Sequence, residues 1–493
     1  MVELSREQRY FWLGFAVLFV GTLLLRSYGI AEISTWMDEA NTAYQVQESP
    51  AEIVAHYAEN QNPPLYYLVL KPWVQLFGIG PLGLRSFSLV FSMLALGVWV
   101  LLLRRYLNWQ MALLGGLFFA LGDVHLYFAQ EGRNYAFSTF WMLCSAGLFF
   151  RTAERTHWLP PVALGVVNAL LLYTHFTTGL LLLTEAAVAL VLLRFRPRAF
   201  RPLLLSALLS LAIFLPWVPN FLSNLPDATT DWRTPPSADV VWLTWARVLG
   251  SKPLGILGLV LAFAGGPWLI WQLRRQGTPP AAQPFPRWLV VLFFNVLAVL
   301  PVVAIVTTAY TVSPVFNWRY VFVVSFGGYA VLAALVWQLY RMGSARWQLA
   351  LAGVLLLGWL GAAVAGLHVP PRKEEDWKGA AAVLAPWLEN PRVGIITSSD
   401  YIAQPFTYHY NRDWYAPGTL EDSLLAHKVF PAKTTTDLPP QALRCCDTLV
   451  LLQAHHLITD PRQRIPDTLR TLGYRNVYFS DSLRHIQWGL WVR

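Results

Sequence analysis

Long apolar runs alternate with short polar segments along the chain up to about residue 370. Runs of about 15 to 22 apolar residues are long enough to cross the hydrocarbon layer of a bilayer as helices. The pattern predicts about eleven such helices. They are expected at residues 11–29, 83–103, 111–127, 134–150, 159–174, 177–193, 203–219, 253–273, 288–309, 320–340 and 348–367.

After the pair Pro370-Pro371 the pattern becomes that of a water-soluble α/β segment. Residues 376–389 have helical periodicity. Four short segments have the pattern of strands, namely residues 393–397, 447–452, 476–480 and 485–492. We therefore expect an α-helical polytopic membrane module over residues 1–369 and a soluble α/β domain over residues 370–493. The membrane module includes a long outward loop at residues 30–82 that carries helices lying along the membrane surface.

The composition supports this division. Of 493 residues, 55% are hydrophobic and only 13% are charged, with a mean hydropathy of +0.42, whereas soluble domains carry about 25% charged residues. A soluble enzyme and a disordered chain are therefore excluded, and three cysteines are too few for a disulfide scaffold. The net charge of +9 does not indicate a nucleic-acid partner, because the arginines stand in small groups between apolar runs.

The arginines predict how the chain is threaded, since basic residues are retained on the cytoplasmic side. Alternate connections are basic: Arg6 and Arg9, Arg104 and Arg105, Arg151 and Arg155, Arg194 to Arg201, Arg274 to Arg287, and Arg341 with Arg346. The other connections, around residues 30–82, 128–133, 175, 220–252 and 310–319, are expected outside together with the C-terminal domain. The first span resembles a signal peptide, but we expect it to be an uncleaved helix.

The outward loop 30–82 contains two helix-start patterns. Ser49-Pro50-Ala51-Glu52 is a capping box with proline at the first helical position, and it predicts a helix to about Asn60. An aromatic-rich stretch follows at residues 64–77. Earlier in the loop, Asp38 and Glu39 are adjacent carboxylates just after a span. Thr35-x-x-Asp38 also fits a capping box, so Asp38 has two compatible interpretations, a helix-start residue and a proton acceptor.

Two further outward turns carry arginines. Residues 122–135 include His125, Glu131, Arg133 and Tyr135. Charged groups at bilayer depth cost about 2.5 to 3.5 kcal/mol each and need a partner or a task. Arg133 offers the bidentate geometry that suits a phosphate, and the alternative is a Glu131–Arg133 pair that neutralises itself.

Residues 313–320 place Arg319 beside Tyr320 before the tenth span. By itself this motif fits an interfacial anchor. Together with Arg133 and Arg85 it predicts a cationic pocket for a lipid phosphate. The loop at residues 220–252, with Asp227, Asp231 and Arg233, fits both a lid over this pocket and a plain connector.

Cofactor chemistry has little support in the sequence. His56, His125 and His175 are isolated, so no metal site is predicted. Walker, Rossmann and hydrolase-elbow motifs are missing from the sequence. No cofactor is therefore expected to be required.

In combination, these motifs resemble those of the membrane-embedded GT-C glycosyltransferases, and in particular the bacterial relatives of protein O-mannosyltransferases and of the lipid A aminoarabinose transferase. The motifs that carry the resemblance are Trp36-Met37-Asp38-Glu39, Asn62-Pro63-Pro64-Leu65-Tyr66-Tyr67, Leu84-Arg85-Ser86, residues 130–135 and Trp318-Arg319-Tyr320. One departure is Asn62, where many relatives have His or Lys.

The resemblance implies an inverting transferase that moves a sugar from a polyprenyl-phosphate donor to a hydroxyl of a glycan, lipid or protein acceptor. The reaction would take place on the outer side of a bacterial inner membrane. Asp38 would be the catalytic base, with Glu39 orienting it or holding the acceptor. Arg133, Arg319, Tyr320 and Arg85 would bind the donor phosphate, and Asn62, Tyr66, His125, Glu131 and Tyr135 would line the donor and acceptor pocket. The alternatives are a flippase or exporter for lipid-linked saccharides, and a polymerase or ligase that transfers a block of glycan.

Overall fold

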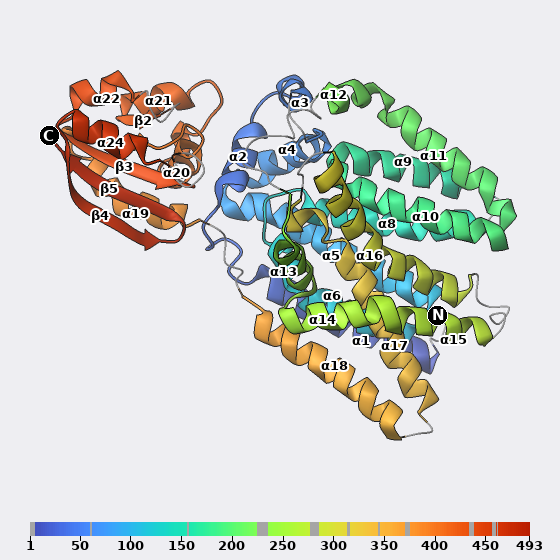
Figure 1. The fold of residues 1–493 in the computed structure, drawn as a ribbon. Coiled ribbons are helices and arrows are strands. Elements are labelled where there is room, and N and C mark those ends of the chain that lie inside the picture. The colour runs from blue at the N-terminus through green and yellow to red at the C-terminus, as the bar shows by residue number, and fades with distance from the viewer. Residues whose placement is uncertain are drawn as a thin grey trace. The chain divides into compact units, whose positions relative to one another are not determined.

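The protein is a mostly helical chain that divides into two compact units (Figure 1). Unit 1 comprises Met1–Tyr28, Val54–Tyr66 and Arg85–Pro371, and unit 2 comprises Gly29–Ile53, Tyr67–Leu84 and Arg372–Arg493. The computed structural model describes residues 5–59, 62–154, 157–223, 235–276, 285–312, 316–343, 346–369, 375–432, 438–455, 460 and 462–493.

Unit 1 is a bundle of apolar helices. Among the described residues, seven helices are long and apolar enough to span a membrane, or eight if the bent pair α6 and α7 counts as one span. The protein is therefore a multi-pass membrane protein. The α-helices of unit 1, including those too short to span a membrane alone, are α1 (Arg6–Ser27), α5 (Pro81–Tyr106), α6 (Trp109–Leu121), α7 (Asp123–Ala129), α8 (Tyr135–Glu154), α9 (Leu159–Thr174), α10 (Gly179–Phe195), α11 (Phe200–Phe214), α12 (Val218–Ser223), α13 (Ala238–Leu249), α14 (Lys252–Val260), α15 (Gly266–Arg275), α16 (Arg287–Thr311), α17 (Val324–Met342) and α18 (Arg346–Gly366).

Every apolar run predicted from the sequence is mainly helical in the structure, but the run predicted at 111–127 is broken at Gly122, where α6 and α7 meet at a bend of 64°. Three of them, α8, α9 and α17, nevertheless lack the length or the hydropathy of an independent span. α9 is only 16 residues long, and nearly every residue of α17 is buried in protein. A helix enclosed by other helices has little contact with lipid, so its sequence need not be as apolar as that of a peripheral span.

The core of unit 1 joins helices that are far apart in sequence. Trp99 of α5 donates its indole N–H to Gly115 O of α6 (2.9 Å). Its ring lies edge-on to Phe294 of α16 and Phe326 of α17, with centroids 5.3 and 5.2 Å apart. α16 and α17 approach closely at Gly327, where a Cβ atom would lie 2.4 Å from the carbonyl oxygen of Phe294. Only glycine fits there without moving backbone.

A ring of three buried polar side chains joins α8, α9 and α10. Ser145 Oγ lies 2.5 Å from Asn168 Oδ1 and 2.6 Å from Glu185 Oε1, and Asn168 Nδ2 lies 3.0 Å from Glu185 Oε2. Glu185 is midway along the apolar span Phe176–Phe195. An ionisable group at such a depth is rare and needs hydrogen-bonding partners, which this ring provides.

Unit 2 combines two segments of the loop at residues 30–82 with an α/β domain. Its helices are α2 (Met37–Gln45), α19 (Trp377–Leu388), α20 (Ala403–Tyr410), α21 (Leu420–Ala426), α22 (Pro440–Cys445) and α24 (Arg464–Thr471), together with most of α4 (Leu65–Phe77), while α3 (Pro50–Ala58) is divided between the units. The strands are β1 (Val393–Thr397), β2 (Val429–Pro431), β3 (Thr448–Ala454), β4 (Arg475–Leu483) and β5 (Ile486–Val492). They form one sheet in the order β2-β1-β3-β5-β4, in which β2, β1 and β3 are parallel and β5 is antiparallel to both neighbours.

The helix at residues 376–389 and the four predicted strands are present in unit 2. The three-residue strand β2 was too short to be predicted from its pattern. The predicted capping box at Ser49 is also present, because Ser49 N–H donates to Glu52 Oε2 (2.7 Å) and Glu52 N–H donates to Ser49 Oγ (3.3 Å). The domain division differs from the expected one, since residues 29–53 and 67–84 group with the C-terminal segment instead of with the membrane helices. Hydrogen bonds that join residues 35–40 to the C-terminal segment are consistent with this grouping and are described below.

Candidate functional site

Asp38 and Glu39 lie in the first turn of α2, which belongs to unit 2. The helix begins at Met37, and its N-cap is Trp36, whose side chain makes no capping hydrogen bond. The predicted Thr35-x-x-Asp38 capping box is therefore wrong, because the helix starts one residue later than the box requires. Glu39 is fully buried, whereas Asp38 is partly exposed. Asp38 is thus a partly exposed carboxylate in the first turn of a helix.

In unit 1 the loop between α7 and α8, residues 130–134, is fixed from three sides. Ser88 of α5 donates its hydroxyl to Glu131 O (2.5 Å). Gln130 Nε2 donates to the carbonyls of Arg26 and Tyr28 at the end of α1 (2.7 and 2.9 Å). Asn134 Nδ2 donates to Thr174 O at the end of α9 (3.2 Å). These bonds hold the backbone on which Glu131 and Arg133 are carried.

The structure brings Arg133 and Arg319 to the same end of the helix bundle. Tyr135, at the start of α8, interacts electrostatically with Arg319, Arg133, Glu131 and Tyr320. Two of the four come from residues 131–133 and two from the turn before α17, nearly two hundred positions later. Glu131 is fully buried and Arg319 is 9% exposed. We call this group, together with His175, the arginine cluster.

His175 is the member of the cluster that the sequence did not identify. Its ring centroid lies 5.4 Å from that of Tyr320 and 6.5 Å from that of Tyr135. Burial and, next, the charge of Arg133 lower the pKa of His175 to about 4, so the ring is neutral at neutral pH. Thr177 N–H, which can only donate, lies 3.2 Å from His175 Nδ1. Nδ1 is therefore the acceptor, and the neutral ring carries its hydrogen on Nε2.

Two guanidinium groups lie close to the ring of Trp318. Arg247 of α13 lies 3.8 Å from the centre of its ring and Arg319 lies 5.1 Å from it. The ring also stacks on Phe128, which in turn stacks on Tyr135. The arginines are thus packed against a group of aromatic side chains. Arg247 lies in an ordinary amphipathic helix, and no motif around it pointed to this position.

Three further residues predicted for the site, Arg85, Tyr66 and Asn62, lie in or near the helices α4 and α5. Arg85 is fully buried in α5, one helical turn before Ser88, which holds the loop of Glu131. Tyr66 is also buried, with its ring 5.9 Å from Phe87 and 6.1 Å from Phe137. Asn62 is half-buried in the bend before α4.

His125 is not brought to the cluster. Its Nε2 lies 2.8 Å from Ser325 Oγ, and its ring packs against Phe119 and Phe326 at 4.5 and 4.7 Å. The ring is 2% exposed. This is a histidine satisfied within the helix core, and we do not include it in the site.

The cluster and the basic connections occupy opposite ends of the bundle. Tyr135 begins α8, and Glu154 ends it at an ion pair with Arg105 (3.0 Å). Twenty residues at 1.5 Å per residue make about 30 Å, the thickness of the hydrocarbon layer. Arg196 and Arg274 lie at the same end as Glu154, because both pack on residues at the start of α16, where Phe285 contacts Phe150 of α8.

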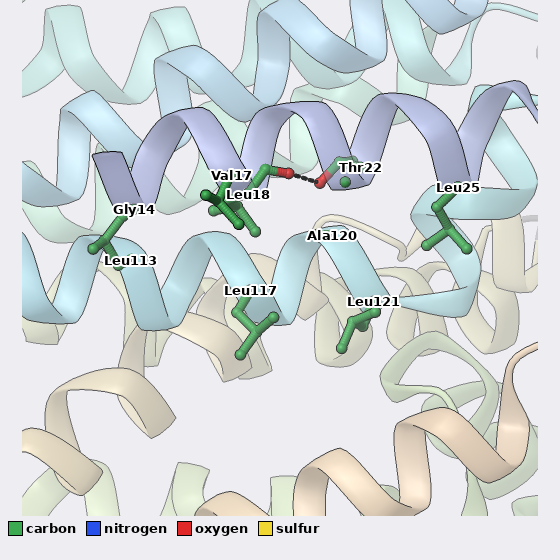
Figure 2. A pocket seen from close by; sticks show the side chains of 10 residues that line it. Gly14, Val17, Leu18, Thr22, Leu25, Leu113, Leu117, Ala120 and Leu121 are labelled. Atoms are coloured by element: carbon green, nitrogen blue, oxygen red, sulfur yellow. Dashed lines mark hydrogen bonds between the residues drawn. The ribbon is translucent and has the colours of Figure 1, made fainter. Parts of the chain in front are cut away.

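A second feature of unit 1 is an apolar groove between α1 and α6, with a volume of about 510 Å³ (Figure 2). Leu113, Leu117 and Leu121 line it from α6, and Gly14 and Val17 line it from α1. Among the described residues that line it, Thr22 carries the one hydroxyl, which is bonded to Leu18 O of its own helix (2.6 Å). The groove contains none of the predicted site residues and offers no group for chemistry.

Parts of the predicted site fall on residues outside the described ranges. These are Ser313, Pro314 and Val315 before Phe316, and Asp227, Asp231 and Arg233 of the loop at 220–252. Within the described ranges, no group of three or more His, Cys, Asp or Glu side chains is arranged to hold a metal ion. Asp38 and Glu39 belong to unit 2 and the arginine cluster belongs to unit 1, and each is described within its own unit.

Comparison with solved structures shows that the chain has the GT-C fold, so the resemblance inferred from the motifs is confirmed for the fold. The sequence itself matches no model of a protein family and no curated protein.

Two crystal structures of ArnT from Cupriavidus metallidurans, in the apo state and bound to undecaprenyl phosphate, have this fold. Each has 14% sequence identity to the chain and a TM-score of 0.56, over 97% of this chain and 98% of ArnT. The oligosaccharyltransferase AglB from Archaeoglobus fulgidus has a TM-score of 0.48 and 11% identity, over 97% of this chain and 74% of AglB.

Proposed function

We propose that the protein is an inverting glycosyltransferase that moves a sugar from a polyprenyl-phosphate donor to an acceptor hydroxyl on the outer face of the membrane. The observation that carries the proposal is the arginine cluster, in which two guanidinium groups, one buried carboxylate, two phenols and a neutral imidazole meet at one end of a membrane bundle. The cluster supplies several hydrogen-bond donors and positive charge, which suit a phosphate monoester or diester. The fold adds support, because ArnT has been crystallised with undecaprenyl phosphate.

In the proposed reaction the acceptor hydroxyl attacks the anomeric carbon and the polyprenyl phosphate leaves from the opposite face. Asp38 takes the proton of the hydroxyl as the new glycosidic bond forms. General-base catalysis usually contributes a factor of about 10² to 10⁴, which is about 3 to 5 kcal/mol of the barrier. Glu39, one residue further along α2, orients Asp38 or holds the acceptor.

Negative charge grows on the departing phosphate during this step. Arg133 and Arg319 stabilise that charge more strongly in the transition state than in the bound donor, which is the condition for catalysis. Tyr320 and the Nε2–H of His175 are neutral donors that complete the binding of the phosphate oxygens. The proposal needs no divalent cation, because the guanidinium groups supply the positive charge.

The sidedness of the site is also a proposal. The ends of the bundle that carry Arg105, Arg196 and Arg274 are opposite to the cluster. Basic residues are retained in the cytoplasm, so the cluster would face outward.

The test is sugar transfer from a polyprenyl-phosphate donor, radiolabelled in the sugar, by purified protein in liposomes. Asp38→Asn should lower kcat by about 10²- to 10⁴-fold with little change in the KM for donor. Asp422→Asn is the matched control, because it removes an exposed carboxylate in unit 2. Near-normal turnover of Asp38→Asn would remove Asp38 from the role of base.

The arginines are tested in the same assay. Arg133→Ala should lower kcat/KM by about 10²- to 10³-fold, the usual cost of losing one donor to a developing anion. Arg198→Ala, an exposed arginine in the turn after α10, is the control and should be neutral. Movement of labelled donor across the liposome without release of polyprenyl phosphate would favour an exporter over a transferase, and transfer of several sugars at once would favour a polymerase or ligase.

A further inference from the structure

The helix that carries Asp38 is held by side chains of the C-terminal segment, more than three hundred residues away in the chain. Met37 N–H, the first donor of α2, lies 3.0 Å from Glu375 Oε2. The first N–H groups of a helix have no partner within the helix and need an acceptor. Trp36, the N-cap residue, does not provide one from its side chain. Glu375 therefore supplies the acceptor for the first N–H group of α2 from outside the local sequence.

The carboxylate of Glu375 accepts further hydrogen bonds from the side chains of Trp377 and His455. Trp377 Nε1–H lies 2.9 Å from Glu375 Oε2, and His455 Nε2 lies 2.8 Å from Oε1. The carboxylate is 1% exposed. Burial acts to raise the pKa of Glu375, but the hydrogen bonds from His455, Met37 N–H and Trp377 outweigh it and lower the pKa below the ordinary value. The group is therefore an ionised carboxylate, and its charge is favourable at a helix amino terminus.

Two more side chains of the same segment bind the backbone on either side of Asp38. His409 Nε2 lies 3.0 Å from Thr35 N and 3.1 Å from Thr35 O. Tyr415, which is fully buried, donates its hydroxyl to Ala40 O (2.8 Å). The backbone is thus held at residues 35, 37 and 40.

The far end of α2 is fixed by a different segment of unit 2. Lys71 of α4 donates its ammonium group to the carbonyls of Val46, Gln47 and Glu48, at 3.2, 3.3 and 2.7 Å. A cation at the carboxyl end of a helix satisfies free carbonyl groups and the helix dipole together. With a carboxylate at one end and an ammonium group at the other, α2 has little freedom to rotate or slide.

We propose that the C-terminal α/β segment is a positioning element for α2, in which Glu375, His409 and Tyr415 fix the backbone around Asp38. These are positioning residues, because they bind the helix and not the reacting atoms. The catalytic consequence rests on the proposed function, in which Asp38 is the base. A base must be held to within a fraction of an ångström of the proton it removes, so loosening α2 lowers the rate of the chemical step before it affects donor binding.

The test compares two tyrosines that each donate one hydroxyl to a backbone carbonyl in unit 2. Tyr415→Phe removes the bond to Ala40 O in α2, whereas Tyr474→Phe removes the bond to Cys446 O (3.0 Å), and both of these residues belong to an apolar cluster of the C-terminal segment that contains no described residue of α2. Hydrogen–deuterium exchange of the amides of α2 is measured in the full-length protein in liposomes. Loss of one hydrogen bond corresponds to about a threefold to tenfold increase in exchange, so Tyr415→Phe should show this increase in α2 and Tyr474→Phe should not.

Glu375→Gln is the second variant, because the amide keeps the size of the side chain but loses the charge and can accept through only one oxygen. It should also raise exchange in α2. It should lower kcat by a factor similar to or larger than this increase in exchange, and the KM for donor should be unchanged. Unchanged exchange in α2 for both Tyr415→Phe and Glu375→Gln would overturn the proposal, as would an equal increase in Tyr474→Phe. A third outcome separates the two proposals. If the two variants show faster exchange in α2 but the wild-type protein transfers no sugar, the positioning role stands and the proposed function is refuted.

Discussion

The ring formed by Ser145, Asn168 and Glu185 allows a prediction from a count of hydrogens. Three contacts close the ring, and each needs one hydrogen between its two heavy atoms. The serine hydroxyl supplies one. The asparagine amide supplies one, because only its nitrogen side can donate. The third hydrogen must come from Glu185, which is therefore a neutral carboxylic acid.

The count does not depend on which way the amide is turned. With Asn168 Oδ1 toward Ser145, the serine donates to the amide and Glu185 must donate to the serine. With the amide reversed, the serine donates to Glu185, and Glu185 must donate to the amide oxygen. Either orientation requires the proton on Glu185. This agrees with its position halfway along an apolar span, where an ionised carboxylate without a cationic partner would be very costly.

Replacing Glu185 with glutamine should therefore be nearly neutral, because a carboxamide can donate to Ser145 and accept from Asn168. We expect a change in the free energy of unfolding below about 1 kcal/mol for Glu185→Gln. Glu185→Ala removes two hydrogen bonds, worth about 0.6 kcal/mol each in membrane proteins, and opens a cavity worth about 2 to 5 kcal/mol. The expected loss for Glu185→Ala is about 3 to 6 kcal/mol.

The assay is reversible unfolding in mixed micelles with increasing denaturing detergent, combined with infrared spectroscopy. The wild-type protein should show the carbonyl band of a carboxylic acid at neutral pH. The Glu185→Gln variant should lack this band. Equal destabilisation by Glu185→Gln and Glu185→Ala, or a carboxylate band in place of the acid band, would refute the count of hydrogens.

Two further predictions concern a close helix contact and a buried carboxylate. Gly327→Ala should destabilise unit 1 by about 1 to 3 kcal/mol because its Cβ atom would meet the backbone of α16, whereas Gly97→Ala, with open space around its Cβ atom, should be neutral or stabilising in the same unfolding assay. The lowered pKa of Glu375 means that the folded state binds its proton more weakly than the unfolded chain does, so its contribution to stability is present above the ordinary value of 4.5 and is lost as the pH falls below it. The protection of the α2 amides, corrected for the intrinsic pH dependence of exchange, should therefore fall below pH 4.5 in the wild-type protein and fall less in Glu375→Gln. An equal fall in both proteins would contradict this assignment.

The local periodicity of the sequence predicted the parts of the fold that depend on neighbouring residues. The apolar runs are helices, the box at Ser49 begins α3, and residues 393–397 form β1, because each of these depends on side chains within about one or two turns or on one strand. The motifs also identified Arg133, Arg319, Tyr320 and Tyr135, which the fold brings to one end of the bundle. That these residues share a function with Asp38 stays a prediction.

Other features were decided only by the tertiary structure. The sequence offered a Thr35-x-x-Asp38 capping box as one of two interpretations of Asp38, but the N-cap residue is Trp36, and the acceptor of Met37 N–H is Glu375, 338 residues away. His175 and Arg247 join the site through contacts with residues on other helices, and the contacts that predict a neutral Glu185 come from Ser145 and Asn168 on two other helices. The physical reason is common to all of these cases. A hydrogen bond or a buried charge depends on which groups the fold places within about 3 Å, and residue spacing along the chain carries no information about partners hundreds of positions away.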